Sequence, residues 1–262
     1  MLSAPKGDRG PAPMSTLSRE MLSGMADAAV DAVDCIRELN ESGSNLVMEA
    51  LRGSNEFTEW AHYPPNEVHD PRSHAHYYFH AHSPDDRDQP DCGHFHTFMG
   101  AKGMPSGIRP ATICDRTHCP SIDDHGMANL IAISMTPAGM PEWLFTANRW
   151  VTAETWYRAS DVIAMLDGFV VNLDQLSRIL NRWLTAMFVL FRPQIEGLLI
   201  ERDRVIERWR VLHPDDDVFQ DRRLEITSSI DISLHQHIEW LDSQLESDSS
   251  AACQEVLAVA VR

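Results

Sequence analysis

The sequence predicts an α+β fold in which a small antiparallel β-meander carries a histidine cluster and is covered by helices from both ends of the chain. Three observations predict it. Apolar residues recur at helical spacing towards both ends, short aromatic or β-branched runs fill the middle, and eight of the 13 histidines lie between positions 62 and 96. We expect a disordered tail over 1–14 and a single domain over 15–250, helical at 15–53, β-rich at 60–151 and helical at 153–246.

The first helix is predicted from Ser15 or Thr16, either of which can cap it, to Asn40. Its apolar residues, from Leu17 through Met21 and Met25 to Leu39, follow the helical period. A shorter helical stretch follows at 45–51. Two segments rich in proline, at 62–65 and 69–71, then end the helical region, because a residue that precedes proline is forced out of helical geometry.

Four strands are predicted in the middle of the chain. The first two, at 76–82 and 94–99, flank a polar loop at 83–93, and two more are expected at 129–135 and 142–148, joined by a turn rich in proline and glycine. Helical spacing returns after Thr152, with an apolar stripe from Leu176 to Phe191 that continues past Pro193. A last helix is expected to direct Ile230, Leu234 and Leu245 inward.

The composition is that of a globular cytoplasmic protein. Apolar residues make up 43% of the 262 residues, and the five cysteines are scattered rather than arranged as a disulfide framework. The 22 basic and 39 acidic side chains give a formal charge of −17, which would repel nucleic acid and anionic lipid. We therefore expect a small-molecule substrate and neither a nucleic-acid nor a membrane partner; the broad apolar helical face could be a core or a homodimer interface.

Two H-x-H pairs carry the functional prediction. Side chains at i and i+2 of a strand share a face, so His80 with His82, and His94 with His96, each form a same-face pair. A hairpin that sets His82 opposite His94 and His80 opposite His96 would bring three or four imidazoles to one metal ion. His76 has the same parity and is a further candidate ligand, while Tyr78 is a candidate catalytic residue.

An imidazole ligand set favours iron or copper first and zinc second over magnesium or calcium. The first expectation is a non-haem iron or copper oxidoreductase, with an open position for dioxygen or substrate beside Tyr78 and Phe98. A zinc-dependent hydrolase or lyase, with Glu67 or Asp70 as its base, and a non-enzymatic metal or haem carrier remain open. A second site is conceivable at Cys114, His118, Cys119 and His125, although their spacing matches no standard zinc motif.

The chain also resembles an uncharacterised bacterial family, a domain of unknown function. The resemblance rests on an HYP motif at 62–64, a YFHxH motif at 78–82, a GHFHxF motif at 93–98 and the segment from Leu144 to Thr152. It implies that these stretches belong to one domain, and it implies no activity.

Overall fold

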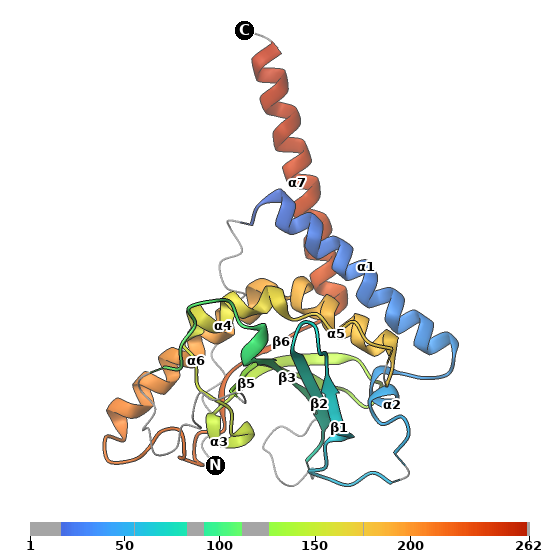
Figure 1. Cartoon of the computed structure of the whole chain (residues 1–262). Coiled ribbons are helices and arrows are strands. Elements are labelled where there is room, and N and C mark those ends of the chain that lie inside the picture. The colour runs from blue at the N-terminus through green and yellow to red at the C-terminus, as the bar shows by residue number, and fades with distance from the viewer. Residues whose placement is uncertain (1–16, 55, 83–91, 112–125, 175, 261–262) are drawn as a thin grey trace.

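A six-stranded antiparallel sheet, with its strands in sequence order, forms the centre of the computed structural model (Figure 1). The structure describes residues 17–54, 56–82, 92–111, 126–174 and 176–260, the last 13 of these as backbone only. The strands are β1 (Tyr63–His69), β2 (Ala75–His80), β3 (His94–Gly100), β4 (Met127–Met135), β5 (Pro141–Ala147) and β6 (Ile226–Asp231). The α+β class and the antiparallel meander are thus confirmed, while the expected tail over 1–14 lies outside the described residues.

The sheet has two strands more than the four predicted. At the first edge β1 begins with Tyr63, Pro64 and Pro65, a segment expected only to end the helical region. Proline cannot donate a ladder hydrogen bond, and an edge strand tolerates this. At the other edge β6 lies within the segment expected to be helical. Its polar residues gave no apolar strand pattern, although Thr227 and Ser228 are buried, and their hydroxyls share hydrogen bonds with the Thr146 hydroxyl on β5.

Helices from both ends of the chain cover one face of the sheet (Figure 1). They are α1 (Arg19–Glu41), α2 (Leu46–Ala50), α4 (Ala159–Met165), α5 (Arg178–Leu190), α6 (Arg192–Leu212) and α7 (Leu234–Ala260); the short α3 (Arg149–Thr152) follows β5. The helix predicted from Ser15 or Thr16 begins later, because Ser18 is its cap and accepts a hydrogen bond from the Met21 amide. Ile230, expected on the last helix, belongs to β6, and α7 begins at Leu234.

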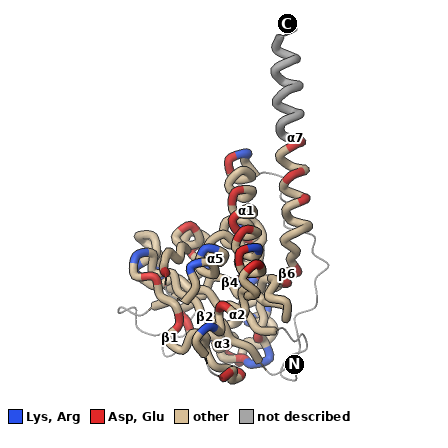
Figure 2. The backbone as a smooth tube through the Cα atoms, turned by 90° about the vertical axis from the view of Figure 1, so that its right-hand side faces the viewer, with Lys and Arg blue, Asp and Glu red and all other residues tan. Residues whose placement is uncertain are grey.

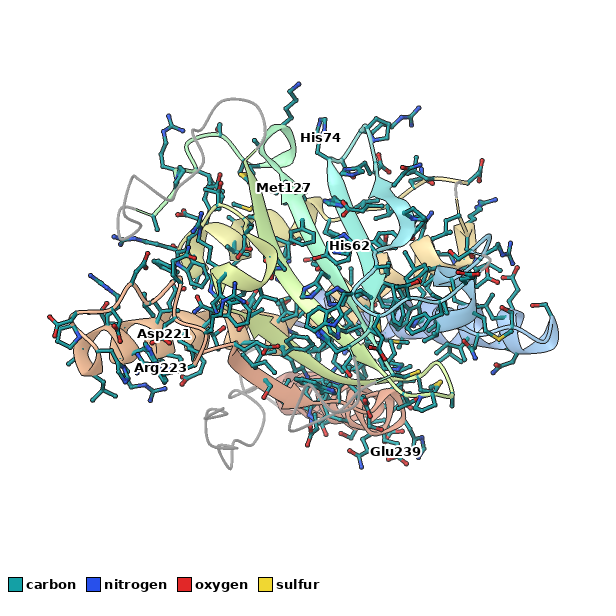
Figure 3. All side chains as sticks on the ribbon, turned by 90° about the horizontal axis from the view of Figure 1, so that it is seen from below. His62, His74, Met127, Asp221, Arg223 and Glu239 are labelled. Atoms are coloured by element: carbon teal, nitrogen blue, oxygen red, sulfur yellow. The ribbon has the colours of Figure 1, made fainter. Side chains whose placement is uncertain are left out.

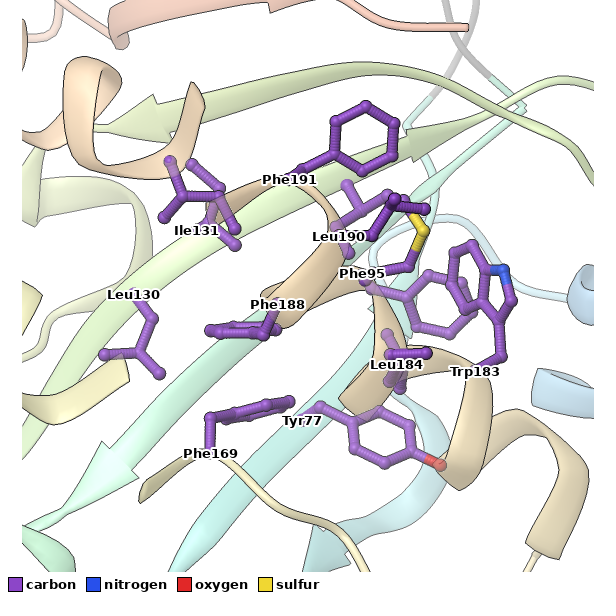
Figure 4. Close-up of a cluster of buried hydrophobic side chains, with 14 of the residues drawn as sticks. Tyr77, Phe95, Leu130, Ile131, Phe169, Trp183, Leu184, Phe188, Leu190 and Phe191 are labelled. Atoms are coloured by element: carbon purple, nitrogen blue, oxygen red, sulfur yellow. The ribbon is translucent and has the colours of Figure 1, made fainter. Parts of the chain in front are cut away.

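The main core lies between the sheet and α5. Trp183, Leu184 and Phe188 of α5 pack against the sheet residues Tyr77 and Phe95, as Figure 4 shows. The Phe95 ring lies 6.0 Å from that of Trp183 and 5.1 Å from that of Phe79, and all three side chains are fully buried. This confirms the predicted apolar stripe. Burial of each such aromatic side chain contributes about 1.5–3 kcal/mol to the free energy of unfolding.

The chain bends by 72° between α5 and α6, where Pro193 occupies the first turn of α6. Proline at that position needs no amide hydrogen and fixes a new helix start. Within the described part of the chain, no single helix is long and apolar enough to cross a membrane, and only the bent α5–α6 pair meets that standard jointly. Aspartate and glutamate positions, red in Figure 2, recur along α1 and along the coloured part of α7, in keeping with the formal charge of −17.

Candidate metal centre

Two neighbouring strands present histidines on the face of the sheet opposite α5, the side from which Figure 3 is viewed. Side chains alternate between faces along a strand, so the residues between the histidines enter the core. The core set is Tyr77, Phe79, Phe95 and Met99, and the opposite set is His76, Tyr78, His80, His94, His96 and Phe98. The shared histidine face predicted from the two H-x-H pairs is therefore present.

Three of the predicted ligands form one compact group, His80, His82 and His94. One nitrogen from each lies within 4.8 Å of the others, and His80 Nε2 is 2.8 Å from His94 Nε2. All three side chains are buried. The His96 ring lies alongside, 4.8 Å from the His94 ring and 5.1 Å from the His80 ring, although His96 is not part of the three-membered group.

The predicted pairing of the hairpin is wrong by two residues. His80 lies opposite His94 and Tyr78 opposite His96, instead of His82 opposite His94 and His80 opposite His96. A shift of two keeps every side chain on its face, which is why the cluster survives the error. The physical reason is that β2 ends at His80, so His82 reaches the group from outside the strand, with its ring 4.8 Å from that of His80.

Aromatic side chains surround the group. The Phe145 ring on β5 lies 5.2 Å from His94, and the Trp60 ring lies edge-on at 4.0 Å from His82. Phe145 is buried, whereas Trp60, which contacts the buried His82, is 56% exposed. Sequence reasoning missed both residues. The alternation on β5 could have indicated Phe145, but Trp60 precedes the strands with no pattern that places it over the cluster.

His76 joins a different set of side chains. The structure groups it with Glu67 and His69 of β1 rather than with His80. A hydrogen bond with His76 lowers the pKa of the Glu67 carboxyl to about 2, against the effect of burial, and a second one with His62 acts in the same direction. Next to His62 the surface has a hollow of about 440 Å³, lined also by Gly53, Ser54, Glu56 and Pro65.

Tyr78 lies between these two sets. Its ring stacks at 3.7 Å on His62 and lies 5.6 Å from His80 and 5.4 Å from His96. Burial, with the negative charges of Glu67 and Glu154, raises the pKa of Tyr78 well above its usual range. The phenol is therefore neutral at physiological pH and can donate a hydrogen bond.

Glu154 is an acidic residue that sequence reasoning did not single out. Burial raises the pKa of its carboxyl to about 7, despite a hydrogen bond from Thr152 and the nearby guanidinium groups of Arg202 and Arg149. A group with this pKa can gain or lose a proton near neutrality. Glu154 follows α3 with no motif around it, so only tertiary packing marks it out.

Asp70, the other candidate base within the described residues, has a structural role. Asp70 accepts hydrogen bonds from the amides of Arg72, Ser73 and Asn172, so it holds a turn together. The proposed second site at Cys114, His118, Cys119 and His125 lies outside the described residues.

Comparison with known proteins gives a family and no activity. The family model described as "Domain of unknown function (DUF6969)" matches residues 26–232. The search of curated proteins and the search of solved structures each gave no match.

Proposed function

The chain belongs to the DUF6969 family, and from the site alone we propose that it is an oxidoreductase that uses non-haem iron or copper, bound by His80, His82 and His94, to act on a small molecule. The observation that carries the proposal is the approach of three buried imidazoles to within 4.8 Å of one another. Imidazole nitrogen suits both metals, and either metal would supply one-electron redox chemistry.

The surroundings of the three imidazoles favour a cation. His80 Nε2 and His94 Nε2 lie 2.8 Å apart, so only one of these two nitrogens can carry a proton and the other presents a lone pair, as a metal ligand does. Histidines at van der Waals distance from Phe145 and Trp60 would incur a desolvation cost on becoming charged. A bound ion would use the lone pairs of these nitrogens in place of the hydrogen bond between His80 and His94.

Tyr78 and His96 complete the proposed site. Tyr78, as a neutral phenol, would donate a hydrogen bond to a substrate oxygen. Its ring lies between those of His62 and His80, and His62 also lines the surface hollow. His96 would be either a fourth ligand or a hydrogen-bonding neighbour of the other three. Phe98, stacked on Tyr78 with ring centroids 5.6 Å apart, would keep that side dry.

A zinc-dependent hydrolase or lyase is the second candidate, and Glu154 favours it. A general base for zinc chemistry needs a pKa near the working pH, and burial raises the pKa of Glu154 to about 7. The carboxylate is close enough to Tyr78 to influence its pKa. Zinc binds the same imidazoles, so the metal content separates the two candidates.

The test is elemental analysis and electron paramagnetic resonance of untagged protein, with His82→Ala as the variant. His235→Ala is the control, since His235 is an 81% exposed histidine on α7. We expect the wild type and the control to retain iron or copper, the variant to lose it, and circular dichroism to be unchanged in all three. Nitric oxide added to the ferrous protein, or azide added to the cupric protein, should alter the spectrum if a coordination position is open.

Other outcomes overturn the proposal in different ways. Zinc alone, even after reconstitution with iron and copper, would reject redox chemistry and favour the hydrolase. A haem absorption band would indicate a haem carrier. Retention of metal by His82→Ala would reject the assigned ligands, and failure of every ion to bind would reject the metal centre altogether.

A further inference from the structure

We propose a second, separate metal site for a divalent cation such as zinc or ferrous iron, held by Glu67, His69 and His76 at the edge of the sheet. Glu67 Oε2 lies 2.6 Å from His76 Nε2 and 3.7 Å from His69 Nε2. Ligand atoms of a tetrahedral ion with bonds of about 2.1 Å lie about 3.4 Å apart. A small outward movement of Glu67 from His76 would therefore admit an ion.

The backbone of β1 is bent so as to bring Glu67 to this face. Tyr63 pairs with Phe79 and Val68 pairs with Tyr77, so β1 advances by five residues where β2 advances by two, and the extra residues form a bulge. Glu67 lies within this bulge and has a φ of +53°. A left-handed conformation is costly for a residue with a side chain and is concentrated at functional positions. β-Bulges likewise occur next to active sites, where they change the direction of a side chain. Here the bulge places a carboxylate against two imidazoles.

The ring nitrogens of His76 are already oriented for such a role. Its Nδ1 lies 3.1 Å from the Met127 sulfur, which could accept a hydrogen bond from Nδ1–H once an ion is bound. The Nε2 atom, which donates to Glu67 in the metal-free protein, would then be free of its proton and could bind the ion. The His69 ring stacks on the His76 ring with centroids 3.9 Å apart, so both Nε2 atoms approach the same carboxylate oxygen. The other Glu67 oxygen lies 2.6 Å from His62 Nδ1, which would orient the carboxylate.

The site differs from the all-histidine centre in position and in chemistry. His76 and His80 are four residues apart on β2, which is about 13 Å at about 3.3 Å per residue, so one ion cannot contact both. Two imidazoles with one carboxylate suit zinc or ferrous iron. The side chain of His69 is 58% exposed and that of Glu67 24% exposed, so an ion can enter from solution and keep bound water.

Titration of metal-free protein with Zn²⁺, and with Co²⁺ as a spectroscopic probe, tests the second site. We expect two ions per wild-type chain, and one ion per chain in His69→Ala, in Glu67→Gln and in His82→Ala. The double variant His69→Ala/His82→Ala should bind none, and His235→Ala should bind two. Because His69 is largely exposed, its substitution should leave the fold intact, which circular dichroism checks.

The readouts separate this inference from the proposed function. One ion per chain that is lost in His82→Ala but kept in Glu67→Gln would overturn the second site, and would mean that Glu67 only accepts hydrogen bonds from histidines. One ion lost in Glu67→Gln and His69→Ala but kept in His82→Ala would support this site and overturn the all-histidine centre. No binding in the wild type would overturn both.

Discussion

The buried carboxyl of Glu154 predicts a pH dependence of stability that Glu154→Gln should remove. Burial raises the pKa of this group from an ordinary value of 4.5 to about 7. A raised carboxyl pKa means that the folded protein binds the proton more tightly than the unfolded chain does. The stabilisation that the protonated Glu154 carboxyl provides is therefore complete below pH 4.5 and is lost as the pH rises through 7.

The magnitude follows from the size of the shift. Each pKa unit corresponds to about 1.36 kcal/mol, so the full effect is about 3 kcal/mol, of which about 2.5 kcal/mol falls between pH 5 and pH 8. The carboxyl is fully buried, so solvent screening removes little of this. For a chain of this size the change corresponds to roughly 5–10 °C in Tm.

The assay is urea unfolding of metal-free wild type, Glu154→Gln and the control Glu239→Gln at intervals from pH 5 to pH 8. Glu239 lies on α7 with a side chain 65% exposed. We expect the difference in unfolding free energy between wild type and Glu154→Gln to move in favour of the variant by about 2.5 kcal/mol as the pH rises. A difference that stays constant over this range would refute the reasoning, as would an equal trend in the control.

Three further substitutions test what holds the site in place, each by urea unfolding at neutral pH. Gly93→Ala should cost about 1–3 kcal/mol, because φ is +120° and an added Cβ would collide with the Phe79 ring; wild-type stability would contradict this. Phe95→Ala should cost about 3–5 kcal/mol by leaving a cavity in the core, whereas Val211→Ala, 71% exposed, should change stability by less than about 0.5 kcal/mol. Asp70→Asn should lower the free energy of unfolding by about 1–3 kcal/mol, because the carboxylate accepts hydrogen bonds from backbone amides. These hydrogen bonds lower the pKa of Asp70 despite its burial, so the wild type should lose its advantage over the variant in strong acid, where the carboxyl is protonated. An advantage that persists there would contradict the role of the carboxylate in the turn.

The alternation of side chains was determined by the sequence alone. A strand has a period of two, so the spacing of His80, His94 and His96 placed them on one face, and the aromatic residues between them required the other face to be the core. The helical period similarly predicted that α5 would cover the sheet. These features depend on local geometry, which needs no knowledge of distant residues.

The pairing of strands and the grouping of ligands were decided only by the tertiary structure. The register depends on where β2 ends and on how the edge strand β1 bulges, and neither has a period that the sequence displays. For this reason His76, which has the parity of His80, instead meets Glu67 from the neighbouring strand. Glu154 likewise acquires its raised pKa from burial by segments distant in the chain, because desolvation depends on the packed surroundings and not on neighbouring residues in the sequence.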